Sequence, residues 1–178
     1  MTRRPDAIRY SVLRMRVRPY RESDFERLCE LHDASRPLEL AASGLSDAFV
    51  PMAQAAGPEG LFDATILVAE DDAGVHGFVA WTDEELTWLY VDPRRHRRGI
   101  ARALVRAALS QAGAPLALDV LVGNEAALAL YRAEGFELQR TVSGRLAGNE
   151  RFAASAHVLR HPGGGSTAQP SIAPTEEA

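Results

Sequence analysis

The stretch VDPRRHRRGIA, residues 91–101, constrains the fold more than any other part of the chain. A strand-like run ends at Val91, Pro93 imposes a turn, and apolar positions at helical spacing begin directly after Gly99. The first turn of a helix that starts there has backbone N–H groups without intrahelical partners, and they lie at the end of the strand. The helix dipole favours an anion there, and Gly99 and Ala101 let it approach the main chain closely. The pattern predicts a strand–turn–helix unit with an anion site; a solvated basic turn is the alternative.

The residues after this turn predict a parallel pair of strands. The helix that begins near residue 100 ends near Gly113, and the run PLALDVLV at 115–122 is strand-like. The run NEAALALYRAEGF predicts a second helix, with Asn124 as its N-cap and Gly135 just past its end. Strands joined by one helix over so short a distance run parallel, with a right-handed crossover.

The remaining runs predict antiparallel strands and an N-terminal helix. Strands are expected at RMRVRPY, ATILVAED, VHGFVAWTD, ELTWLYV, FELQRTV and RFAASAHVLR, and the second and third of these form a hairpin. The run SDFERLCELH predicts a helix, with Ser23 as N-cap and Glu26 completing a capping box. Residues 38–56 predict one or two short helices joined loosely. The pattern as a whole indicates an α/β fold.

The charge composition argues against a protein that binds nucleic acid. The formal net charge is -4, whereas a nucleic-acid-binding domain normally presents a net positive face. All 20 basic residues are arginines, which excludes a lysine Schiff base and a Walker phosphate loop. Cys29, the single cysteine, has no partner for an internal disulfide and falls on an apolar helical stripe. That position indicates a structural thiol rather than a nucleophile.

Length and hydropathy predict one domain over residues 1–161, followed by a disordered C-terminal tail at 162–178. The sequence contains neither a signal-peptide core nor an apolar run of about 18 residues, so we expect a cytoplasmic protein without a membrane partner. His32, His76, His157 and His161 lack metal-ligand spacing. We therefore expect these histidines at the surface or in loops, and no metal.

Two blocks of the sequence resemble the GNAT family of N-acetyltransferases. LYVDPRRHRRGIARAL is similar to the family's acyl-CoA pyrophosphate loop, V-x-P followed by [Q/R]-x-x-G-x-[G/A], with His96 where Gln or Arg is usual. DVLVGNEAALALYRAEGF is similar to the family's pattern N-x-x-A-x-x-L-Y-x-x-x-G-F. The resemblance runs from about residue 17 to 160. It implies a three-layer fold: a mostly antiparallel central sheet of six to seven strands, a parallel pair splayed at the cofactor site, and helices on both faces.

The resemblance implies an enzyme that passes an acetyl group from acetyl-CoA to a primary amine in a ternary complex. The acceptor would be a small molecule or the N-terminus of a protein or peptide. By the resemblance, Tyr131 is the general acid that protonates the departing thiolate, with an aromatic core residue as the alternative. For the general base the sequence offers Asp119, acting directly or through water. Glu84 and Glu85 compete with it, unless they are solvated strand ends.

The resemblance also assigns acetyl-CoA to one strand, the loop and the later helix, with no metal. The strand would offer main-chain groups to the pantetheine arm, and the loop would bind the pyrophosphate. The assigned set is Leu89, Tyr90, Val91, His96, Arg97, Arg98, Gly99, Ile100, Ala101, Asn124 and Tyr131. On the acceptor side, Trp81 and Trp88 line the pocket or belong to the core. The loop SGRLAGNE would contribute Arg145, Asn149 and Glu150.

Three functions follow from these observations. An N-acetyltransferase is favoured over an acyl-CoA-binding sensor or interaction module without turnover, and a nucleic-acid binder is least favoured. An acidic pocket would suit a polyamine or protein amine, whereas Arg145 would suit an acceptor that bears a carboxylate. The arginine-only, alanine-rich composition predicts a GC-rich bacterial genome, and a homodimer is left open.

Overall fold

A computed structural model describes residues 15–163 of the chain. The strands are β1 (Arg16–Pro19), β2 (Thr65–Asp71), β3 (Gly74–Trp81), β4 (Leu86–Val91), β5 (Leu116–Leu121), β6 (Glu137–Arg145) and β7 (Ala153–His161). The α-helices are α1 (Phe25–Ala42), α2 (Met52–Ala55), α3 (Ile100–Ala112) and α4 (Glu125–Ala133). Short 3-10 turns are η1 (Glu22–Asp24), η2 (Ser46–Ala48), η3 (Leu61–Asp63) and η4 (Pro93–Arg95). The predicted C-terminal tail lies outside the described residues from position 164 on.

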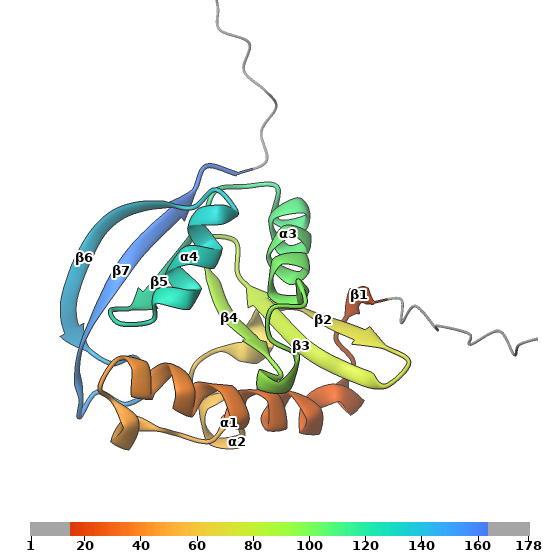
Figure 1. The fold of residues 1–178 in the computed structure, drawn as a ribbon, viewed down its shortest axis with the longest axis horizontal. Helices are drawn as coiled ribbons and strands as arrows, with labels where there is room; N and C mark the ends of the chain where they lie inside the picture. The colour runs from red at the N-terminus through yellow and green to blue at the C-terminus, as the bar shows by residue number, and fades with distance from the viewer. Residues whose placement is uncertain (1–14, 164–178) are drawn as a thin grey trace, which may run out of the picture.

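The strands form two antiparallel sheets. The sheets meet at one end of the parallel pair β4 and β5, one strand from each sheet. One sheet has the order β1-β2-β3-β4 and the other the order β5-β7-β6. Where they meet, Glu85 and Ala117 form a parallel bridge, and the Ala117 N–H donates to the Glu84 carbonyl at 2.8 Å. Beyond the bridge, β4 and β5 have no further pairing and splay apart (Figure 1). The α/β fold with a splayed parallel pair is thus confirmed, with the seven described strands divided between two sheets.

Helices cover both faces of the first sheet (Figure 1). On β2, Ile66 and Val68 pack into the cluster that holds α1 and α2, whereas Leu67 and Ala69 pack into the cluster that holds α3 and α4. Alternate side chains of a strand point to opposite faces, so a strand buried on both faces must be apolar throughout. This burial explains the continuous apolar run of β2.

Helix α1 differs from its prediction at both ends. Ser23 does not cap it; the chain instead turns through η1, where the Asp24 carboxylate accepts the Arg21 N–H at 2.8 Å. The helix then runs for 18 residues to Ala42, and it includes Pro37. Leu28, Leu31 and Leu40 are buried along it, so tertiary packing sustains a helix that local sequence signals predict to end earlier.

Two histidines expected at the surface are buried. His32 is 3% exposed and His76 is 4% exposed. Each ring lies against an aspartate: His32 Nδ1 is 2.8 Å from Asp33 Oδ1, and His76 Nε2 is 2.6 Å from Asp71 Oδ1. None of the helices in residues 15–163 is long and apolar enough to cross a membrane.

Candidate active site

The splay between β4 and β5 opens a cavity of about 760 Å3, which we call the cofactor cavity. Helices α1, α3 and α4 close it on the remaining sides. Of the residues assigned to acetyl-CoA from sequence, those that line it are Leu89, Tyr90, Val91, His96, Arg97, Gly99, Ile100, Ala101, Asn124 and Tyr131. Arg98 is exposed and does not line the cavity.

Helix α3 presents an uncapped N-terminus to this cavity. Its N-cap residue, Gly99, has a left-handed backbone at φ 80°, and no side chain caps the first turn. Arg97 also has a positive φ of 58°, a conformation that costs a non-glycine residue about 1–2 kcal/mol. Both residues, with Ile100 and Ala101, line the cavity. The free amides and the positive end of the helix dipole can therefore attract an anion to the cavity wall.

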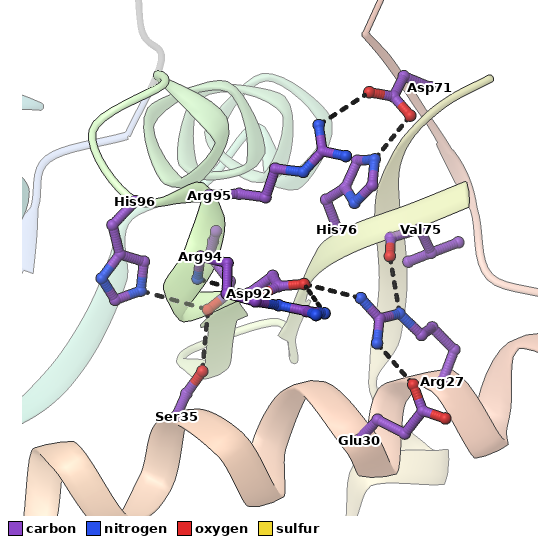
Figure 2. A network of polar contacts seen from close by, with 11 residues as sticks. Arg27, Glu30, Ser35, Asp71, Val75, His76, Asp92, Arg94, Arg95 and His96 are labelled. Carbon is purple, nitrogen blue, oxygen red and sulfur yellow. Dashed lines mark hydrogen bonds and ion pairs between the residues drawn. The ribbon is translucent and has the colours of Figure 1, made fainter. Parts of the chain in front are cut away.

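Asp92 anchors the loop that leads to this helix (Figure 2). Its carboxylate accepts the backbone N–H of Arg94 at 3.0 Å, Nη2 of Arg94 at 2.9 Å and Nη2 of Arg27 at 3.0 Å. The hydrogen bonds from Arg94, and then that from Arg27, hold the pKa of Asp92 well below its usual range. Arg94 thus pairs within the loop, and it does not line the cofactor cavity.

Arg95 is an arginine of the RRHRR run that was not assigned to the site from sequence. It lines the cofactor cavity, and its Nη1 lies 3.4 Å from Asp71 Oδ2 (Figure 2). Asp71 also accepts from His76 at 2.6 Å, and that hydrogen bond lowers the pKa of Asp71. Position in the run RRHRR could not separate Arg95 from its neighbours, because the direction of each side chain depends on the turn η4.

Some main-chain N–H and C=O groups of β4 face the gap between β4 and β5. The Asp92 N–H donates to the His76 carbonyl of β3 at 2.8 Å. Successive residues of an antiparallel strand alternate in direction, so Tyr90 turns its main-chain groups towards β3, whereas Leu89 and Val91 turn theirs towards the splay. The Val91 carbonyl already accepts from Ser35 Oγ at 2.8 Å. Leu89 therefore has the main-chain groups best placed for a ligand.

A second cavity of about 300 Å3, the acceptor cavity, lies beside the first. Helix α1, strand β4 and the segment that joins β6 to β7 line it, and Trp88, Arg145 and Asn149 contribute side chains. Asn149 Nδ2 donates to the Ala48 carbonyl at 3.0 Å and so ties this segment to η2. Glu150 does not line the cavity, and Trp81 packs in the core.

The two cavities share a common boundary. The residues that line both are Arg36, Glu39, Thr87, Tyr90 and Asp119. At this boundary Arg36 Nη1 donates to Glu39 Oε2 at 2.7 Å, and the Tyr90 hydroxyl lies 3.4 Å from the same oxygen. Burial, and then the charge of Glu39, raises the pKa of Tyr90. The α1 residues of this boundary carry no signal in the sequence, since only the fold brings them to β4.

The three residues predicted from sequence to be catalytic are placed differently. Tyr131 lines the cofactor cavity and is 7% exposed, and burial raises its pKa. Asp119 is exposed at the shared boundary. Glu84 and Glu85 are both exposed at the start of the parallel pair, and neither lines a cavity. The structure thus brings Tyr131 and Asp119 to one site and leaves Glu84 outside it.

The family and structure comparisons agree with this architecture. Residues 62–138 match the model of the acetyltransferase (GNAT) domain. No curated protein matches the chain significantly in sequence. Among residues 15–163 there is no group of three or more His, Cys, Asp or Glu side chains that could hold a metal ion.

Solved structures of acetyltransferases share the fold at low sequence identity. The ribosomal-protein-S18-alanine N-acetyltransferase of Escherichia coli is 19% identical, with TM-score 0.65, over 90% of this chain and 99% of that chain. The ribosomal-protein-alanine N-acetyltransferase of Brucella melitensis is 21% identical, with TM-score 0.63, over 82% and 98%. A phosphinothricin acetyltransferase of Sinorhizobium meliloti in complex with acetyl-CoA is 21% identical, with TM-score 0.64, over 91% and 94%.

Proposed function

We propose that the protein is an N-acetyltransferase that moves an acetyl group from acetyl-CoA to a primary amine. The match of residues 62–138 to the GNAT domain model and the fold shared with solved acetyltransferases support this proposal. The observation that carries the proposal is the shared boundary of the two cavities. A thioester in one cavity and an amine in the other can meet there directly. Direct transfer needs no covalent enzyme intermediate and therefore no nucleophilic cysteine. Cys29, the single cysteine, packs against the core cluster of α1 and α2 and lines neither cavity.

The cofactor cavity fits the chemistry of acetyl-CoA. A diphosphate needs backbone amides and cations, which the uncapped start of α3 and the side chains of Arg95 and Arg97 supply. A pantetheine arm needs main-chain partners, which Leu89 supplies on β4. The cavity volume of about 760 Å3 lies within the range that suits a cofactor-sized ligand.

The chain's own residues can assist each step of the transfer. The amine nitrogen forms a bond to the thioester carbon, and the Leu89 N–H is the donor best placed for the oxygen that becomes negative. The carbon–sulfur bond then breaks, and the Tyr131 hydroxyl gives its proton to the departing thiolate. The proton that the acetylated nitrogen loses as it becomes an amide returns to the Tyr131 oxygen and restores the hydroxyl. The Asp119 carboxylate holds the acceptor's ammonium group at the boundary, and its assignment as general base stays a prediction.

The experiment is acetyl-CoA consumption, measured as thiol release, with a panel of amines. The panel contains polyamines, amino acids and peptides with a free N-terminus, because the acceptor cavity contains both carboxylates and Arg145. Turnover with at least one amine supports the proposal. Acetyl-CoA binding by calorimetry without turnover on the whole panel would favour the acyl-CoA sensor instead, and absence of binding would refute both. Cytoplasmic location and a homodimer stay predictions.

A further inference from the structure

The acceptor cavity contains a buried titratable side chain that the steps above do not use. His32, on helix α1, lines the cavity and is 3% exposed. Its ring centroid lies 4.8 Å from that of Tyr90, 5.8 Å from that of Trp88 and 6.2 Å from that of Phe49. These aromatic rings shield His32 from bulk water on several sides.

Asp33 fixes which ring nitrogen of His32 carries the proton. Its Oδ1 lies 2.8 Å from His32 Nδ1 and also accepts the Met52 N–H at 2.8 Å. An ionised carboxylate can only accept hydrogen bonds, so the ring nitrogen that faces Asp33 must donate one. The proton of the neutral ring is therefore on Nδ1, and the lone pair is on Nε2. Nε2 has no hydrogen-bond partner in residues 15–163, and it is not among the fully enclosed polar atoms. Nε2 is therefore the ring nitrogen that can accept a proton, on a side chain that lines the acceptor cavity.

His32 lies close to the point where the reacting groups must meet. Its nearest aromatic neighbour, Tyr90, lines both cavities, so the ring is one side chain away from the shared boundary. A general base acts within hydrogen-bond reach of the proton or through one water. Because His32 lines the acceptor cavity itself, an ammonium group that enters this cavity can come within that reach.

Burial keeps His32 neutral at pH 7. Burial lowers its pKa below the ordinary value of 6.5, although Asp33 and Glu39 act in the opposite direction. Arg36 on the same helix lowers it further. The other titratable and charged groups that line this cavity are Glu59, Tyr90, Asp119 and Arg145. A neutral imidazole has a lone pair on one ring nitrogen, and that nitrogen can accept a proton.

We propose that His32, oriented by Asp33, takes the proton from the acceptor's ammonium group before the amine attacks the thioester. The N–H bond breaks, its electron pair stays on the amine nitrogen, and Nε2 gains the proton. The imidazolium keeps this proton until the acetyl group has been transferred and then releases it to water. Asp119 keeps the task of holding the ammonium group. His32 is thus a catalytic residue and Asp33 a positioning residue. The inference rests on the proposed function.

The pH dependence of kcat/KM tests this inference. An alkylammonium ion has a pKa of about 10.4, so an enzyme without a base must use the small fraction of free amine, which grows tenfold per pH unit. For the wild type we expect log kcat/KM to be flat between about pH 7 and 9, with an acid limb below 6.5 where His32 is protonated. For His32→Gln we expect a loss of about 100-fold at pH 7 and a slope near one up to pH 9.

The pH profiles of further variants separate a catalytic role of His32 from a structural one. Asp33→Asn should move the acid limb to lower pH, because the carboxylate that raises the pKa of His32 is gone. His157→Gln is the matched control: it removes a histidine of β7 that lines neither cavity, and the wild-type profile should persist. A His32→Gln profile that is unchanged, or lowered equally at every pH, overturns the inference. So does a slope of one that appears in Asp119→Asn and not in His32→Gln.

A second measurement does not depend on turnover. Long-range 1H–15N correlation NMR of the histidine rings at pH 7 should show His32 with Nδ1 protonated and Nε2 unprotonated. A neutral ring with the proton on Nε2 overturns the inference even in an inactive protein. An inactive wild type with the expected tautomer refutes the proposed function and, with it, the catalytic role of His32, whereas an active wild type with the wrong tautomer refutes the role of His32 alone.

Discussion

At the scale of single residues, burial controls the chemistry of Tyr131. The ring is 7% exposed and packs edge-on against Phe136 with centroids 5.4 Å apart. Burial, and then the charge of Glu39, raises its pKa above the ordinary value of 10. A phenol with a raised pKa keeps its proton throughout the neutral range, which is the state that a general acid requires.

Tyr131→Phe removes the proposed acid and keeps the ring. We expect kcat to fall by about 100-fold while the KM for acetyl-CoA stays within about threefold, because the hydroxyl acts only as the thiolate departs. Since the raised pKa keeps Tyr131 protonated, the wild-type rate should show no loss from its ionisation up to pH 9. Thiol-release kinetics check both, with Tyr20→Phe as the control outside the cavities. An unchanged kcat would remove Tyr131 from the mechanism.

The arginines of the loop differ in what they contact. Arg95 lines the cofactor cavity and has one contact, at 3.4 Å, with Asp71, whereas Arg98 is exposed outside the cavity. We expect Arg95→Ala to weaken acetyl-CoA binding by about tenfold, as expected when a charge-assisted contact to phosphate is lost. Arg98→Ala should change the Kd less than twofold. Calorimetric titration at fixed salt decides, and equal losses in both variants would contradict the placement of Arg95.

At the scale of elements, a glycine in β3 sets the distance of helix α3 from the sheet. A Cβ at Gly77 would lie 3.0 Å from the Tyr90 carbonyl oxygen, 3.0 Å from Val91 Cγ2 and 3.2 Å from Ile100 Cγ2. These contacts are closer than ordinary van der Waals separation. The first residue of α3 can therefore approach the end of β4 only because position 77 has no side chain.

Gly77→Ala should displace the start of α3 from β4. We expect a loss of about 1–3 kcal/mol in unfolding free energy from overpacking, together with a higher KM for acetyl-CoA. Gly57→Ala is the matched control, because a Cβ there has no neighbour within 4 Å. Urea unfolding and steady-state kinetics provide the two readouts. A stable variant with the wild-type KM would show that the packing at Gly77 does not position the helix.

At the scale of the whole molecule, carboxylates paired with arginines hold the edge of the first sheet. Arg18 donates to Asp24 at 2.7 and 2.9 Å and contacts Glu70 Oε2 at 2.7 Å, and Arg16 Nε donates to Glu70 Oε1 at 2.7 Å. The hydrogen bond from Arg18 is the main cause that lowers the pKa of Glu70 to about 2. The pairs join β1, β2 and the start of α1.

This network predicts the response of the fold to acid. The folded-state pKa of Glu70 is lowered from 4.5 to about 2, so its contribution to stability is complete above pH 4.5 and is lost as the pH falls towards 2. Glu70→Gln should therefore be less stable than the wild type at pH 7 and should lose less stability between pH 4.5 and 2. Urea unfolding at several pH values measures this. Parallel pH curves for the two proteins would contradict the assignment to Glu70.

The helix α3 shows why part of the site could be predicted. Its start at Ile100, with Gly99 before it, follows from local signals: a strand end, a glycine and apolar spacing. Asn124, which accepts the Ala127 N–H at 3.2 Å and caps α4, follows from the same kind of signal. These features depend on residues close together in the chain, so the sequence contains them.

The boundary of the two cavities shows what local signals could not contain. Arg36 and Glu39 of α1 lie beside Tyr90 of β4 only because α1 packs across the strand, and Glu39 is on the helix only because α1 continues past Pro37. The same packing makes His32 a buried cavity residue instead of the surface residue that its spacing suggested. The sequence by itself determined the strand–turn–helix unit and the succession of strands along the chain, because neighbouring residues specify them. Only the tertiary structure decided which arginine enters the cavity and which histidine lines it, because side-chain direction and burial depend on contacts between distant segments.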